Sequence, residues 1–347
     1  MTLPQTYFAS LSLVILTMFC WGSWANTLKM AGNWRFELFY FDYSFGVLLS
    51  AVIAAFTFGT LGSDGFQFLD DLMQTGKRNI FFGLLGGVVF NLANMLLVAA
   101  ISVAGLAVAF PVGIGLALVI GVAWNYFIKP QGNPILLFGG ATVIVAAIIV
   151  DALAYRAHEA AKLEAKAKAG KLKTSAPRAS MKGVILSLGS GVLMGSFFPL
   201  VEIGKAYGPG MGPYAIGFVF AVGVFLSTFI FNLFFMNLPV EGEPVEILEY
   251  FREGDIRKHA LGVLGGMIWC AGGLSNFVAA SAERAAQVGP AVSYAMGQGS
   301  TLVSALWGLL VWKEFAGSDF RVKNLLVVMI ALFLLGLALV SVAPVYR

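Results

Sequence analysis

The chain has 347 residues, of which 59% are hydrophobic and only 12% are charged, and its mean hydropathy is +0.85. Soluble proteins carry about 25% charged residues, so this composition excludes a soluble globular domain. The net charge is +4, but eight of the 22 basic residues lie in one stretch, 155–182, and a basic bias confined to one segment gives no reason to expect a nucleic-acid partner.

Apolar runs long enough to cross a bilayer follow one another along the chain. A spanning helix needs about 20 residues, and no basic residue precedes Lys29, so the first run is expected to remain as a helix and not to be cleaved as a signal peptide. The sequence predicts an all-α polytopic membrane protein with ten transmembrane helices, at 8–30, 38–60, 79–102, 105–127, 133–154, 183–205, 213–238, 259–282, 287–312 and 323–343.

The ten predicted helices divide into two groups of five. We expect a first repeat at 1–154, a basic linker at 155–182 and a second repeat at 183–347. Five helices is an odd number, so the second repeat must be inverted relative to the first, as in many secondary transporters. Internal matches support this: Gly86-Gly87 with Gly265-Gly266, Pro111 with Pro290, Tyr43–Gly46 with Tyr214–Gly217, and Trp21–Trp24 with Met194–Phe197.

The basic residues also predict an orientation, because cytoplasmic loops collect Lys and Arg. Sixteen of the 22 fall on the side of the linker. We therefore expect the linker to be cytoplasmic and both termini extracytoplasmic, in a plasma membrane of the bacterial inner-membrane type. The sequence leaves the oligomeric state open.

Polar side chains near the middle of the spans are the candidate substrate-binding residues. Polar groups are costly inside a bilayer and tend to face a cavity or another helix. Amides beside large aromatic faces suit an uncharged polar ligand, although each amide could instead link two helices. The predicted set is Trp21, Ser23, Trp24, Asn26, Asn91, Asn94, Trp269, Asn276, Tyr294 and Gln298.

Charged residues and prolines supply candidates for coupling and movement. Asp42, Lys29 and Glu202 lie near helix ends and are candidates for proton coupling or gating, with a salt bridge to Lys205 as the alternative for Glu202. Pro111 and Pro290 are expected to act as matched helix hinges, because a proline inside a helix removes a hydrogen bond and bends the axis.

Catalytic and metal-binding chemistry lacks its usual residues. The two histidines and two cysteines form no cluster with metal-ligand spacing, and the linker has no phosphate-binding loop. We therefore expect no enzymatic activity, no cofactor and no metal; the partners would be a small-molecule substrate, protons as the coupling ion, and lipid.

Several motifs resemble known transporters. Overall, the inverted arrangement looks like the drug/metabolite transporter superfamily. The segments Phe19–Ser23, Gly266–Asn276 and Gln298–Ser304 resemble glucose/ribose porter-type sugar uptake proteins, whereas Asp42-Tyr43, Gly86–Asn94 and Asn125–Phe127 resemble the ureide permeases. The resemblance implies proton-linked uptake of a small neutral polar solute.

The sequence therefore predicts a secondary active transporter, a proton-coupled symporter that works by alternating access. A monosaccharide such as glucose is the first substrate expected. A ureide or nucleobase permease is the alternative, and a drug/metabolite exporter is a further one, since aromatic pockets also bind lipophilic molecules.

Overall fold

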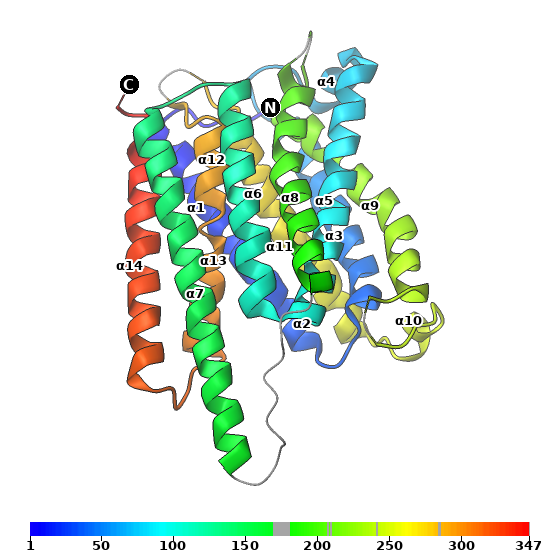
Figure 1. Ribbon diagram of the computed structural model, residues 1–347. Coiled ribbons are helices and arrows are strands. Elements are labelled where there is room, and N and C mark those ends of the chain that lie inside the picture. The colour runs from blue at the N-terminus through cyan, green and yellow to red at the C-terminus, as the bar shows by residue number, and fades with distance from the viewer. Residues whose placement is uncertain (169–180, 207, 209, 241, 284–285, 347) are drawn as a thin grey trace.

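The computed structural model describes residues 1–168, 181–206, 208, 210–240, 242–283 and 286–346. All regular structure in these residues is helical, as the sequence predicts (Figure 1). The helices are α1 (Tyr7–Ser23), α2 (Ala25–Ala31), α3 (Phe36–Phe56), α4 (Phe68–Gln74), α5 (Lys77–Ala104), α6 (Leu106–Ile128), α7 (Pro134–Lys168), α8 (Met181–Ala206), α9 (Pro213–Asn237), α10 (Glu249–Arg252), α11 (Ile256–Ala280), α12 (Pro290–Gly297), α13 (Ser300–Leu306), η2 (Trp307–Val311) and α14 (Phe320–Val342).

In the described residues, nine helical segments are long and apolar enough to cross a membrane. The expected span at 287–312 is not one continuous helix. Instead α12, α13 and the π-helical turn η2 follow one another, with Gln298 and Gly299 between the first two. Glycines on both sides of Gln298 weaken helical continuity there, and hydropathy alone could not reveal such a break.

The expected linker is partly helical. α7 continues to Lys168, well past the end of the apolar run at 154, because this stretch is rich in Ala, Lys and Glu, which favour helix. α8 begins at Met181. The remainder of the linker, 169–180, lies outside the described residues.

Both termini lie at one end of the helical bundle, here called the termini end (Figure 1). α4 lies at the same end, whereas α2, α10 and the far end of α7 lie at the opposite end, here called the linker end. α5 packs on α8 and α9, and α11 packs on α1 and α3. α7 packs along α14 at one side of the bundle.

Glycines allow two pairs of helices to cross with their backbones in contact. A Cβ atom on Gly87 of α5 would lie 2.1 Å from the Phe220 carbonyl oxygen of α9. A Cβ atom on Gly266 of α11 would lie 1.9 Å from the Tyr43 carbonyl oxygen of α3. No other residue fits at either crossing without moving a helix.

The contacts of the partner helices repeat the same geometry. Gly46 of α3 meets the carbonyl oxygen of Val263, and Gly223 of α9 meets that of Leu84. These contacts relate Gly46 to Gly223, and not to Gly217 as the sequence match suggested. The match of Trp21–Trp24 with Met194–Phe197 agrees with the packing, because Gly265 faces the Trp24 carbonyl and Gly86 faces that of Phe197.

Gly266→Ala is expected to destabilise the protein by roughly 1–3 kcal/mol, because a methyl group there pushes against the α3 backbone. Thermal unfolding in detergent measures the effect as a lower Tm. Gly139→Ala is the matched control, since nothing lies within 4 Å of a Cβ atom at that position. Equal melting temperatures for both variants would contradict the close crossing.

Candidate functional site

Aromatic side chains from three helices stack at the centre of the bundle. The Trp21 ring of α1 stacks on Trp269 of α11 with centroids 5.8 Å apart, and its Nε1 donates a hydrogen bond to the Trp269 carbonyl at 3.2 Å. Phe90 of α5 also packs against Trp269, with ring centroids 4.2 Å apart. Two of the predicted site residues thus form one aromatic surface, which Phe90 extends.

A second row of side chains, which includes the predicted residues Trp24 and Asn94, adjoins this surface. Trp24 packs on Tyr43 at 4.9 Å, Tyr43 stacks on Tyr40 at 4.8 Å, and the Tyr40 hydroxyl accepts a hydrogen bond from Asn94 Nδ2 at 3.1 Å. Asn94 is one helical turn from Phe90 on α5. The row therefore ends on an amide next to the stacked rings.

Three of the predicted polar residues join helices to one another. Asn91 Nδ2 donates to Ser227 Oγ of α9 at 2.8 Å. Asn276 Oδ1 accepts from Ser293 Oγ at 2.6 Å, and its Nδ2 donates to the Ser293 carbonyl at 3.1 Å. The Tyr294 hydroxyl donates to the Met194 carbonyl at 3.1 Å. These contacts favour the structural alternative for Asn91, Asn276 and Tyr294.

Gln298 differs from Asn91, Asn276 and Tyr294 because its side chain bonds to no other helix. Its side chain is only 6% exposed, yet it makes no side-chain hydrogen bond to any described residue. It lies at the break between α12 and α13, and a Cβ atom on the preceding Gly297 would lie 2.9 Å from both the Trp21 ring and Asn276 Nδ2. The side-chain oxygen of Asn94, Oδ1, also accepts no hydrogen bond from any described residue. Both side chains therefore have hydrogen-bonding groups without a partner among the described residues, as have Asn91 Oδ1 and the Tyr43 hydroxyl.

Ser23 and Asn26 lie nearer the linker end. Ser23 Oγ accepts from Trp307 Nε1 at 2.8 Å, and Asn26 Oδ1 accepts from Trp312 Nε1 at 2.6 Å. Both bonds tie α1 and α2 to the segment that begins at η2. Neither Ser23 nor Asn26 forms a hydrogen bond with Gln298 in the described part of the chain, so the substrate-binding role expected of them stays a prediction.

Lys29 forms an ion pair with Glu314 at the linker end and lies over the Trp312 ring at 4.4 Å. Glu314 also accepts from the Tyr155 hydroxyl at 3.1 Å, and its carbonyl lies 2.8 Å from His158 Nε2. The pair therefore connects α2, α7 and the loop after η2. We call Lys29, Tyr155, His158 and Glu314 the linker-end network.

Asp42 lies in a separate cluster at the start of α3. Its carboxylate accepts from the Tyr250 hydroxyl at 2.5 Å and lies 2.8 Å from His259 Nδ1. Burial raises the pKa of the Tyr250 phenol, and the Asp42 hydrogen bond adds to the effect, so the hydroxyl stays protonated as the donor. Asp42 is thus held by α10 and α11.

Glu202 pairs with Lys205 at 2.6 Å, and both side chains are at least nine-tenths buried. The pair lines a cavity of about 1030 Å³ at the termini end, with Lys129 on its other side. The salt bridge is the alternative that the sequence left open. Glu202 also lies beside this cavity, and its role in gating stays a prediction.

The two predicted hinges differ. Pro111 is inside α6, as expected of a hinge. Pro290 is the first residue of α12, where a proline removes no helical hydrogen bond, so the structure does not place it at a helix kink. Pro199, inside α8, is an internal proline that the sequence reasoning missed.

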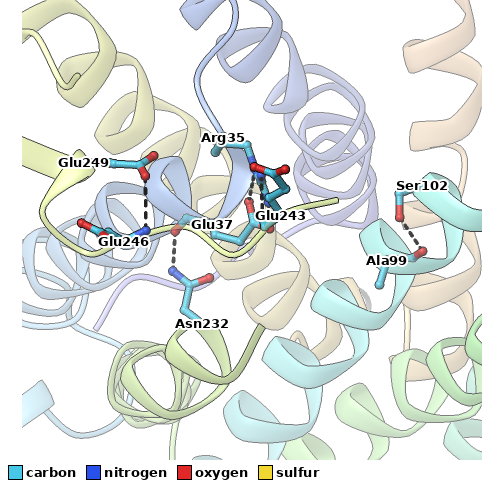
Figure 2. Close-up of polar contacts among 8 residues, drawn as sticks. All are labelled: Arg35, Glu37, Ala99, Ser102, Asn232, Glu243, Glu246 and Glu249. Carbon is cyan, nitrogen blue, oxygen red and sulfur yellow. Dashed lines mark hydrogen bonds and ion pairs between the residues drawn. The ribbon is translucent and has the colours of Figure 1, made fainter. Parts of the chain in front are cut away.

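The polar insert after α9 is anchored at the linker end (Figure 2). Arg35 pairs with Glu37 at 2.8 Å and donates to the Glu243 carbonyl at 3.3 Å, while Asn232 of α9 donates to the Glu37 carbonyl. These bonds hold the start of α3 against α9 and the insert. They place fixed charge at the linker end of the bundle.

The sequence reasoning also missed Asp151, a buried carboxylate in α7. The signal was present, because Asp151 is the only charged residue in the predicted span 133–154. Tyr155 and Glu314 carried no such signal, since their contact joins residues 159 positions apart.

A bundle of membrane-spanning helices around aromatic rings and uncharged amides defines a membrane transporter for a small solute. No group of His, Cys, Asp and Glu in the described residues could hold a metal ion. The ureide permease family model matches residues 39–186 and 178–343, so the chain belongs to the ureide permease family. Its members are transporters and not enzymes, as the sequence predicted for this chain.

Individual relatives extend the match to nearly the whole chain. Ureide permease 2 of Arabidopsis thaliana is 24% identical over 98% of this chain and 97% of its own length. Probable ureide permease A3 of Vigna unguiculata is 30% identical over 45% of this chain and 43% of its own. A solved structure described only as "Crystal structure of protein" shares the fold, with a TM-score of 0.61, 15% identity and 96% of each chain covered.

Asn276→Ala is expected to lower the Tm more than Gln298→Ala, although both amides are buried. Removing Asn276 leaves Ser293 without its partner, at a cost of about 1–3 kcal/mol. Gln298 has no partner to lose. Thermal unfolding of the two purified variants makes the comparison, and a larger loss for Gln298→Ala would show that its amide supports the fold.

Proposed function

We propose that the chain is a secondary transporter that carries a ureide, or a related nucleobase, across the membrane. Membership of the ureide permease family supports this substrate class. The observation that carries the proposal is the pair of amides with unpaired groups, Asn94 through its Oδ1 and Gln298 through its whole side-chain amide, near the stacked indoles of Trp21 and Trp269. A ureide presents N–H donors and carbonyl acceptors that amides can pair with, and indole faces cover a flat ring.

This proposal replaces the monosaccharide that the sequence favoured. The relatives are named for ureides, and the alternative substrate is therefore the better supported one. Rings and amides serve a sugar as well as a ureide, so residue types alone could not choose between them. The resemblances to sugar uptake proteins and to the drug/metabolite superfamily remain predictions.

The architecture we propose is two inverted five-helix halves, 1–154 and 183–347. The repeated glycine contacts support it, because α5 meets α9 as α11 meets α3. In this arrangement α12, α13 and η2 together form the tenth membrane-crossing element. Broken helices often bind substrate between such halves, and Gln298 lies at the break.

We propose that transport occurs by alternating access at the two ends of the bundle. Lys29 and Glu314 close the linker end, while the termini end holds the 1030 Å³ cavity lined by Glu202 and Lys129. We propose that the linker-end pair separates when the opposite end closes. Asp42, held by Tyr250 and His259, would steady α3 during this movement.

We further propose that protons drive accumulation. The excess of basic residues near the linker supports an orientation in a plasma membrane of the bacterial inner-membrane type, with the linker cytoplasmic and both termini extracytoplasmic. In this orientation the larger cavity faces the outside.

Proteoliposomes that contain the protein are expected to take up labelled allantoin. Unlabelled allantoin or uracil should compete, whereas glucose in the same excess should not. Asn94→Ala and Gln298→Ala should abolish uptake, with the Asp70→Asn variant, a change on the exposed side of α4, as the control. Uptake of glucose without uptake of allantoin would favour the monosaccharide hypothesis. A protein that takes up neither compound would refute the proposed function.

The charge exchange Lys29→Glu with Glu314→Lys is expected to recover uptake that each single change reduces. Each single change places two like charges in contact, which disfavours closure of the linker end. Uptake of labelled allantoin by the two single variants and the double variant provides the measurement. If the double variant is no better than the worse single one, the pair is not the gate.

A further inference from the structure

Asp151 of α7 is a carboxylate within a membrane-spanning helix that no part of the substrate site uses. It is 6% exposed, and its buried Oδ1 atom has no hydrogen-bond partner among the described residues. With a rise of about 1.5 Å per residue, it lies about 26 Å from the start of α7, inside a hydrocarbon layer of about 30 Å. An ionised carboxylate without a partner is very unfavourable in such a place.

The carboxylate lies on the inward face of α7, in line with the linker-end network. Asp151, Tyr155 and His158 follow one another at spacings of four and three residues and so share one side of the helix. Tyr155 donates to Glu314 Oε2 at 3.1 Å, and Glu314 pairs with Lys29, whose side chain is 43% exposed. A row of polar groups thus runs from Asp151 to the solvent.

Few other titratable groups surround this position. On α14, which packs along α7, the titratable residues are Arg321 and Lys323 in the first turn, and Arg321 lines a surface cavity with Leu153 on the outer side of α7. α6, also packed on α7, contributes Tyr126. No described cation pairs with Asp151, so a proton is the ion best suited to neutralise it.

The backbone next to this row is also irregular. η2 is a π-helical turn, a feature that is often found at functional sites. A Cβ atom on Gly308 within it would lie 2.9 Å from Glu314 Oε2 and 3.3 Å from the Tyr155 hydroxyl. Any movement of η2 therefore changes the contacts of both groups.

We propose that Asp151 is the site that binds and releases the coupling proton. One proton from the solvent at the termini end adds to a carboxylate oxygen to form a neutral carboxylic acid while the linker end is closed. When Glu314 separates from Lys29, that proton leaves toward the linker-end solvent and regenerates the carboxylate. The proposal rests on the proposed function, since it names the coupling site of that transporter.

The test compares Asp151→Asn with wild type in proteoliposomes, using labelled allantoin. A pH difference of one unit can drive an accumulation of about tenfold if one proton accompanies each substrate. Wild type should accumulate allantoin to this extent. Asp151→Asn should equilibrate it to a ratio of about one, yet still exchange internal for external allantoin. Asp151→Glu should restore part of the accumulation.

Glu159→Gln is the matched control, because it removes an exposed carboxylate two turns further along α7. It should behave as wild type. Accumulation by Asp151→Asn at the wild-type level would overturn the proposal, as would loss of accumulation in Asp42→Asn alone. A wild-type protein that moves no allantoin would instead refute the proposed function.

A second measurement does not depend on the substrate. Infrared difference spectra of the purified protein between alkaline and acidic pH should contain a carboxylic-acid C=O band that is missing in Asp151→Asn and present in Glu159→Gln. The same band in all three proteins would show that another carboxyl group binds the proton and would overturn the assignment.

Discussion

Backbone contact at the glycine crossings is the constraint on which the rest of the structure depends. Gly87 and Gly266 allow α5 to touch α9 and α11 to touch α3. Close approach of helices provides the packing that holds membrane proteins together, where the hydrophobic effect no longer acts between helices. Phe90 and Trp269 lie on α5 and α11, one turn beyond these crossings, and their ring centroids are 4.2 Å apart.

The polar groups of the interior divide according to whether another helix satisfies them. Asn276 is fully bonded to Ser293, whereas Gln298, also buried, has no side-chain partner among the described residues. An unsatisfied amide in an apolar surrounding is unfavourable, so a ligand that pairs with it gains that free energy on binding. Because the ions lie toward the ends of the bundle, this gain is available to a neutral ligand.

The two ends of the bundle differ in the contacts that we propose relate transport to protonation. Glu314 joins the ion pair with Lys29 to the hydroxyl of Tyr155, and Tyr155 lies one turn from Asp151. Opening of the linker end therefore alters the surroundings of the buried carboxylate. The termini end has no such link in the described residues: Glu202 and Lys205 pair within one helix beside the cavity.

The spanning helices and the neutral interior could be read from the sequence, because a run of about 20 apolar residues in lipid must satisfy its backbone by local helical hydrogen bonds. The break at Gln298 could not, since the length and hydropathy of the stretch 287–312 are also compatible with one continuous helix. The partners of the polar side chains could not be predicted either. Asn91 bonds to Ser227, 136 positions away in the sequence, and Lys29 pairs with Glu314, 285 positions away. The backbone hydrogen bonds of a helix are local, so the hydropathy of one stretch of sequence is enough to predict a spanning helix. The partners of its side chains depend on which helices pack together, and only the tertiary structure decides that.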